Sequence, residues 1–166
     1  NKIYTKIFLK NLDIKTIDYI GLEYLEFKEK KDEAIRKCME LGFPLIIKQI
    51  SLGSSVGIKI ATNIIELVDA INYGFKYEDE LVIERKLGKF KEFNQAVLEL
   101  EDEYYPSEIE EVININPYLT FADKYLPSET KKEIPAKIDK ELKEKITAIT
   151  LKAAKALKTN GVIRID

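Results

Sequence analysis

The first residues of chemical interest are a lysine and the glycine- and serine-rich turn that follows it. Leu45–Ile47 is a short apolar run that predicts a buried strand, and Lys48 stands directly after it. Because an unpaired ammonium group is costly to bury, Lys48 must reach either water or an anion. The small residues of the turn are Gly53, Ser54, Ser55 and Gly57. Their N–H groups and hydroxyls could surround phosphate oxygens, although a plain surface turn is an equal alternative on local grounds.

The composition of the 166 residues restricts the function. The 27 basic and 29 acidic residues nearly balance, so nothing indicates a nucleic-acid-binding surface. No apolar stretch approaches the ~20 residues of a membrane span. The single cysteine, Cys38, excludes an intramolecular disulfide and is expected as a buried thiol. Because there is no histidine, any metal ion should be a hard cation held by carboxylates and substrate phosphates.

Hydrophobic periodicity and capping residues predict a mixed order of helices and strands. Helices are expected at 2–11, 28–41, 64–75 and 138–157. Strands are expected at 14–20, 45–48, 58–61, 81–84, 92–99, 108–113 and 162–165. Residues 114–136 hold three prolines and many polar residues, which predicts a long loop of the kind that often forms a lid. This order is typical of an α+β protein, with a boundary between two lobes near Gly88–Lys91.

Two helices carry more detailed expectations. The helix at 28–41 should bury Cys38 and Met39 on its apolar face. Asn63 should cap the next helix, with Glu66 completing a capping box, and Ile64 should begin the buried stripe of that helix. At the ends of the chain, Asn1 lies inside a helical pattern and Asp166 ends an apolar strand, so we interpret the sequence as a fragment of a longer protein.

Seven stretches agree, in order and approximate spacing, with the motifs of one enzyme family. They are Tyr4–Lys6, Phe43–Ile58, Val82–Glu84, Glu92-Phe93 with Ala96-Val97, Ala122–Tyr125, Ile134–Ala136 and Arg164–Asp166. With them the chain resembles the D-alanine–D-alanine ligases, which have the ATP-grasp fold. The resemblance implies two α+β lobes with the nucleotide cleft between them. These would be a central lobe at 1–90 and a truncated C-terminal lobe at 91–166, with a lid at about 114–136.

The resemblance also assigns a nucleotide site. By this resemblance the ATP-binding residues are Lys6, Lys48, Gly53, Ser54, Ser55, Gly57, Glu84, Arg85, Leu87, Glu92 and Lys124. Lys6 and Lys48 would contact the phosphates, Glu84 would lie along the adenine edge, and Glu92 would accept hydrogen bonds from the ribose hydroxyls. Charge-assisted hydrogen bonds of this kind contribute roughly 1.5–3 kcal/mol each.

A catalytic role follows from the same resemblance. The catalytic residues would be Ser54, Lys124, Tyr125 and Arg164, and Asp166 would be the first ligand of Mg²⁺ (or Mn²⁺). A D-alanine carboxylate would attack the γ-phosphate of ATP, and a second D-alanine would displace phosphate from the acyl phosphate. The resemblance implies that the full-length parent protein makes a peptidoglycan precursor in the cytoplasm from ATP and D-alanine. It also implies that this parent is a homodimer.

The chain departs from the family pattern in several ways. Gln49 stands where the family usually has proline, and one extra residue separates Gly88 from Glu92. Nothing corresponds to the family's N-terminal domain or to the metal ligands expected after Asp166. We therefore expect a chain that binds nucleotide weakly and makes no dipeptide by itself.

Other functions and simpler explanations stay open. The parent could join D-alanine to D-lactate or be another carboxylate–amine ligase, although the lactate-making relatives tend to place histidine in the lid. The chain could also be a nucleotide-binding module without catalysis. Glu84 and Glu92 could be solvated strand carboxylates, Lys124 could be surface charge, and Arg164 could form a simple ion pair with Asp166.

Overall fold

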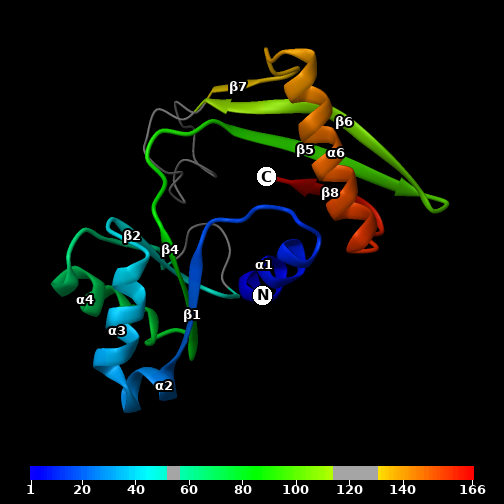
Figure 1. The fold of residues 1–166 in the computed structure, drawn as a ribbon. Helices are drawn as coiled ribbons and strands as arrows, with labels where there is room; N and C mark the ends of the chain where they lie inside the picture. The colour runs from blue at the N-terminus through cyan, green and yellow to red at the C-terminus, as the bar shows by residue number, and fades with distance from the viewer. Residues whose placement is uncertain (52–56, 114–130) are drawn as a thin grey trace. The chain divides into compact units, whose positions relative to one another are not determined.

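The computed structural model describes residues 1–51, 57–113 and 131–166, and these form two compact units (Figure 1). The first unit is Asn1–Gly88 and the second is Lys89–Asp166. Each unit combines one four-stranded antiparallel sheet with helices, so the α+β class expected from the sequence is confirmed. Among the described residues, no helix is long and apolar enough to cross a membrane.

The sheet of the first unit has the strand order β1-β4-β2-β3. Its elements are α1 Lys2–Asn11, β1 Tyr19–Glu23, α2 Tyr24–Glu29, α3 Lys31–Glu40, β2 Leu45–Gln49, β3 Lys59–Ala61, α4 Ile64–Gly74 and β4 Glu80–Arg85. Alternate residues of a strand point to opposite faces, and Leu45 and Ile47 of β2 point into the core with Cys38 of α3 and Leu67 of α4. Burial of Cys38 raises the pKa of its thiol to about 11, which makes it an inert structural residue.

The opposite face of this sheet carries α1. Ile3 of α1 is buried, and its side chain lies so close to Gly21 of β1 that a Cβ there would sit 2.8 Å from Ile3 Cδ1. Gly21 is paired in register with Val82 of β4. Glu84 therefore lies on this α1 face, two residues along the same strand, rather than in the core.

Several local expectations for the first unit were wrong. Residues 14–18 are not a strand, because β1 begins at Tyr19 and the carbonyl of Ile17 accepts a hydrogen bond from a lysine side chain instead of a strand. The helix expected at 28–41 is two helices, because the backbone leaves the helical conformation at Lys30. Met39 and Ile64 are 40% and 46% exposed, since their positions fall at the edges of the buried stripes.

The cap expected at Asn63 is confirmed. The Asn63 side chain accepts a hydrogen bond from the N–H of Glu66 at 3.0 Å. The Glu66 carboxylate reaches back to the N–H and hydroxyl of Thr62 at 2.7 and 2.8 Å, one residue earlier than a standard capping box. These bonds lower the pKa of Glu66.

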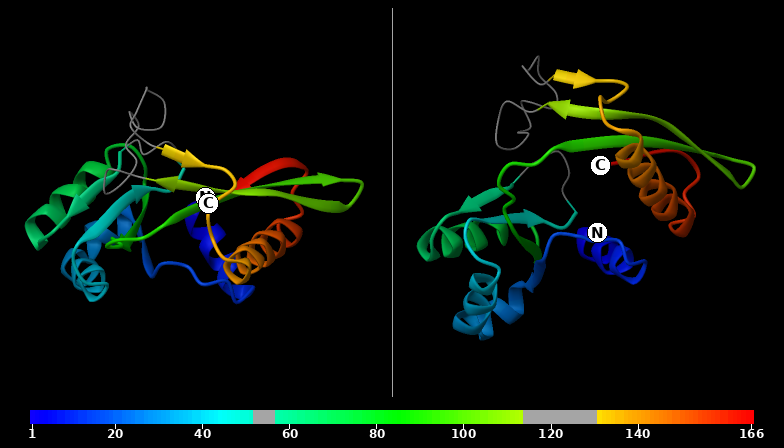
Figure 2. Two further views of the ribbon diagram at one scale, coloured as in Figure 1. Left: turned by 90° about the horizontal axis from the view of Figure 1, so that it is seen from above. Right: turned by 45° about the horizontal axis from the view of Figure 1, so that its top comes forward.

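The sheet of the second unit has the order β7-β6-β5-β8. Its elements are β5 Glu92–Leu100, β6 Glu103–Ile113, β7 Lys131–Glu133, α6 Lys140–Ala156 and β8 Gly161–Ile165. The two longest strands, β5 and β6, form a hairpin whose turn residues Glu101 and Asp102 both have positive φ angles, as a tight two-residue turn requires (Figure 2). β6 begins five residues before the expected strand, because the hairpin pairing continues to the turn.

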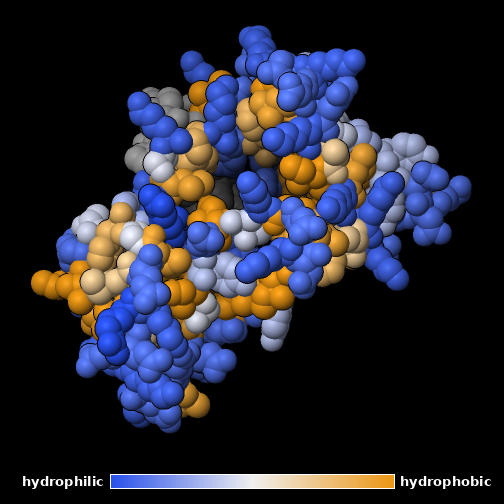
Figure 3. Space-filling view, in the orientation of Figure 1, coloured by the Kyte–Doolittle hydropathy of each residue, from blue (hydrophilic) through white to orange (hydrophobic). Residues whose placement is uncertain are grey.

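Helix α6 packs on one face of this sheet, where Gln95 Nε2 of β5 donates to Thr147 Oγ1 at 3.1 Å. The helix begins with Asp139 as its N-cap, which accepts from the N–H of Leu142 at 2.8 Å. β7 lies inside the stretch expected to be a loop, whereas residues 114–130 of that stretch are outside the described residues. Val162 is one of the exposed apolar side chains, at 72%. On the face that Figure 3 shows, hydrophobic patches lie among hydrophilic side chains.

Candidate functional site

The strongest charged cluster of the first unit is centred on Glu84. In the ladder between β2 and β4, Ile46 is paired with Glu84 and Lys48 is paired with Val82. Lys48 therefore lies on the same face as Glu84, one diagonal step away. Its ammonium group donates to Glu84 Oε2 at 2.5 Å.

Lys6 approaches the same carboxylate from α1. Its Nζ lies 2.8 Å from Glu84 Oε1, so the two carboxylate oxygens are divided between two lysines. The Lys6 ammonium also donates to the carbonyl of Ile17 at 3.1 Å and lies 5.1 Å from the centre of the Tyr19 ring. The structure thus brings together Lys6, Lys48 and Glu84, three of the residues expected to bind nucleotide.

The electrostatics of the cluster favour the ionised form of Glu84. Glu84 is only 4% exposed, and burial by itself raises its pKa, but the charges and hydrogen bonds of Lys48 and Lys6 outweigh burial and hold the pKa below its usual value. One carboxylate shared by two ammonium groups leaves a net positive charge. The cluster is therefore suited to an anion, although the same pairs also stabilise the fold.

Sequence reasoning missed a third lysine next to this cluster. The Lys2 ammonium donates to the carbonyl oxygens of Gln49 and Ile50, at 2.9 and 3.4 Å, where β2 ends. Burial lowers the pKa of Lys2, with Lys48 contributing in the same direction against Glu78 and Glu84. The detectable signal was its spacing, because Lys2 and Lys6 stand four residues apart and share one face of a helix.

The glycine-rich turn is described only at its end. Gly53, Ser54 and Ser55 lie outside the described residues, so their expected phosphate contacts stay predictions. Gly57 has a φ of +74°, and a Cβ there would lie 2.4 Å from Gln49 Nε2, so both conformation and space require glycine. Gln49 does not interrupt β2: it is buried, and it pairs in register with Leu81.

The residues after Glu84 are less constrained. Arg85 ends β4 and is exposed, and Leu87 is 42% exposed. Between them, the N–H of Lys86 donates to the carbonyl of Pro44 at 2.8 Å, which fixes this segment to the start of β2. Their expected place along an adenine edge stays a prediction.

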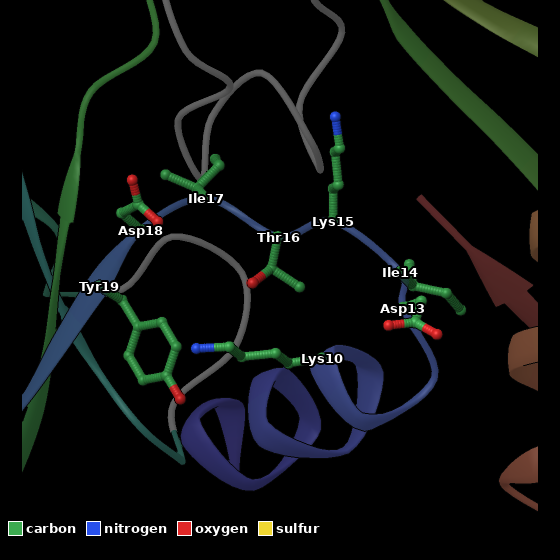
Figure 4. Close-up of a pocket in the computed structure, with 8 residues that line it drawn as sticks. All are labelled: Lys10, Asp13, Ile14, Lys15, Thr16, Ile17, Asp18 and Tyr19. Carbon is green, nitrogen blue, oxygen red and sulfur yellow. The ribbon is translucent and has the colours of Figure 1, made fainter.

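A cavity of about 620 Å³ lies beside the Lys6 side of the cluster, between the end of α1 and the segment before β1. It is lined by Lys10, Asp13, Ile14, Lys15, Thr16, Ile17, Asp18 and Tyr19. Figure 4 shows Lys10 extending toward Tyr19 and Thr16 pointing into the space, whereas Lys15 points away. Because none of its lining residues was expected to bind nucleotide, the cavity defines the surroundings of Lys6 rather than the predicted site itself.

The second unit carries the remaining described candidates, Glu92 on β5 and Arg164 and Asp166 at the end of β8. Arg164 Nε donates to Asp166 Oδ1 at 2.7 Å, and both side chains are more than half exposed. This hydrogen bond is the main reason that the pKa of Arg164 is raised, and the charges of Glu110 and Glu92 add to it. Lys124 and Tyr125 lie outside the described residues.

A divalent cation fits this face on chemical grounds. The described residues contain no group of three acidic, histidine or cysteine side chains that would hold a metal ion alone. Magnesium, however, commonly uses one or two carboxylates together with water and substrate phosphates. Asp166 supplies one such carboxylate, and the neighbouring β5 carries a buried amide oxygen, Asn94 Oδ1, without a hydrogen-bond partner among the described residues. Arg164 would have to release part of Asp166 when a cation binds.

Comparison with known proteins identifies the family and the fold of the chain. The family model described as "D-ala D-ala ligase C-terminus" matches residues 8–166. A D-alanine–D-alanine ligase from Thermosipho africanus is 33% identical over 170 residues, which is all of this chain and 45% of the relative. The solved D-alanine–D-alanine ligase of Bacillus anthracis is 29% identical with a TM-score of 0.77, covering 100% of this chain and 51% of that one. The D-Ala:D-Ser ligase VanG from Enterococcus faecalis is 25% identical with a TM-score of 0.79, covering 98% and 46%.

The fold is therefore that of the ATP-grasp enzymes, as the resemblance implied. The chain belongs to the D-alanine–D-alanine ligase C-terminal family. It spans about half the length of the curated relatives that it matches.

Proposed function

We propose that this chain is the ATP-binding part of a D-alanine–D-alanine ligase. The observation that carries the proposal is the Glu84 cluster, in which two ammonium groups share one buried carboxylate. Such a cluster keeps a net positive charge in place before any ligand arrives, which is what a polyphosphate requires. The family match over residues 8–166 supports the choice of reaction.

In the proposed reaction, the chain's own residues position charge. Lys6 and Lys48 bind the phosphates of ATP, and Glu84 holds both ammonium groups in place. Glu92 binds the ribose hydroxyls, and Arg164 stabilises the negative charge that develops during phosphoryl transfer to a D-alanine carboxylate. Asp166 holds Mg²⁺ or Mn²⁺, which supplies charge neutralisation at the transferred phosphoryl group when bound.

The test is a calorimetric titration of the 166-residue chain with ADP, which measures the affinity for ADP. Lys48→Met should weaken ADP binding by roughly 10- to 100-fold, because one charge-assisted hydrogen bond is worth about 1.5–3 kcal/mol. Lys15→Met is the matched control, since Lys15 is exposed and its side chain points away from the cavity beside α1. Equal losses in the two variants, or no loss in Lys48→Met, would contradict the proposed site.

Other properties of the proposed enzyme follow from the family. The relatives are about twice as long as this chain, so we expect no steady ADP release or dipeptide when the chain is mixed with ATP, Mg²⁺ and D-alanine. The parent protein would act in the cytoplasm as a homodimer on the path to peptidoglycan. Detection of D-alanyl-D-alanine with the chain alone would refute the expected inactivity.

A ligase with a different second substrate is the main alternative. The observation that favours it is the likeness to VanG, a D-Ala:D-Ser ligase, at a TM-score of 0.79. D-Lactate or another amine or hydroxyl acceptor belongs to the same alternative, and a non-catalytic nucleotide-binding module is the remaining one. Competition between D-alanine, D-serine and D-lactate in a full-length enzyme assay would separate the ligases, and absence of all three products would favour the module.

A further inference from the structure

Asn94 is a buried residue of the second unit, and only one of the two polar atoms of its side-chain amide has a hydrogen-bond partner among the described residues. The residue is 4% exposed, and its Nδ2 donates to Glu110 Oε1 of β6 at 2.9 Å. Its Oδ1 has no hydrogen-bond partner among the described residues. An unpaired buried carbonyl oxygen costs on the order of 1–3 kcal/mol, so a donor that arrives with a ligand would be favoured.

The sheet register places Asn94 between two carboxylates. Asn94 is paired with Glu110 across β5 and β6. On the other side of β5, Gln95 is paired with Ile165, the last residue of β8. Continuing this antiparallel register by one residue brings Asp166 level with Asn94 and onto the same face. This face is opposite to α6, because Gln95 points to Thr147 of that helix. Since Nδ2 is directed to β6, Oδ1 of the planar amide is directed away from it.

The register thus places three acceptors in one row across the sheet: Glu110, Asn94 Oδ1 and Asp166. Two cations contact this row: Lys132 Nζ lies 3.5 Å from Glu110 Oε1, and Arg164 donates to Asp166. A single hydroxyl could satisfy Oδ1 but would leave the two carboxylates as they are. A hydrated divalent cation supplies both positive charge and several O–H donors, which matches the whole row.

We propose that Asn94 is a positioning residue of the divalent-cation site at Asp166. Its Oδ1 accepts a hydrogen bond from a water molecule on the cation, and its Nδ2 holds the Glu110 carboxylate beside it. The inference rests on the proposed function, which gives Asp166 the cation.

The test measures Mn²⁺ binding to the 166-residue chain in the presence of ADP, with electron paramagnetic resonance as the readout. Asn94→Leu should weaken Mn²⁺ binding about tenfold, the lower end of the effect of losing an outer-sphere partner. Asn94→Asp keeps an oxygen at this place and should bind Mn²⁺ at least as tightly as the unchanged chain. Asn72→Leu, at an exposed asparagine of α4, is the matched control and should change nothing.

A second titration, with ADP and EDTA, separates this inference from the proposed function. ADP affinity without metal should be equal in Asn94→Leu and the unchanged chain. The inference is overturned, while the nucleotide site stands, by either of two results. In the first, Asn94→Leu lowers ADP affinity in EDTA as much as it lowers Mn²⁺ affinity. In the second, Asn94→Leu leaves Mn²⁺ affinity unchanged. If the unchanged chain binds ADP in neither condition, both the proposed function and the inference fail.

Discussion

The Glu84 cluster and the Arg164–Asp166 pair are built in opposite ways. Glu84 is buried, and its partners Lys6 and Lys48 come from a helix and a strand that are distant in sequence. Arg164 and Asp166 are exposed neighbours two residues apart at the end of one strand. The first pairing depends on the tertiary structure, whereas the second would be possible in almost any extended segment. Only the first set of ion pairs should therefore make a large contribution to the stability of the fold.

The largest expected effect is that of Glu84→Gln on stability. The change removes the buried carboxylate charge between Lys6 and Lys48. The free energy of unfolding should therefore fall by about 3 kcal/mol, the low end of the cost of breaking a buried ion pair. Urea denaturation followed by circular dichroism measures the difference. Glu40→Gln, at an exposed site of α3, is the control and should stay within about 0.5 kcal/mol of the unchanged chain. A similar loss in both variants would show that Glu84 has no special role.

The second prediction is the pH dependence of that difference. The pKa of Glu84 is lower in the folded protein than in the unfolded chain, because Lys48 and Lys6 outweigh burial. Its stabilising contribution is therefore complete above the unfolded value of about 4.3 and is lost as the pH falls toward the folded value. The gap in unfolding free energy between the unchanged chain and Glu84→Gln should be constant from pH 7 to 5 and narrow below about pH 4.3. A gap that stays constant to pH 3 would contradict the shared carboxylate.

The smallest expected effect is that of Arg164→Gln on stability. The pair that it forms with Asp166 is exposed, and exposed pairs contribute about 0.2–1 kcal/mol at most. The free energy of unfolding should change by less than about 1 kcal/mol. A loss as large as that of Glu84→Gln would remove the contrast between the two sites, and the same urea experiment decides it.

Much of the fold could be predicted from the sequence because its signals are local. The α1 helix, the Asn63 cap and the strands around Lys48 and Glu92 follow from periodicity and end signals within a few residues. The secondary-structure predictions were wrong where the pairing of one strand with another decides whether a strand forms. Residues 14–18 have the apolar residues of a strand but pair with no strand in the part of the chain that the structure describes. β7 forms from a polar stretch because it pairs with the edge of β6.

The candidate site divides in the same manner. The sequence by itself determined the residue types: a lysine at the end of a strand, a carboxylate on another strand, and Arg164 beside Asp166. Only the tertiary structure decided that Lys6, Lys48 and Glu84 meet, that Lys2 lies beside them, and that Asn94 donates to Glu110. The physical reason is that strand register and helix packing set distances between residues far apart in the chain, and no local pattern encodes those distances.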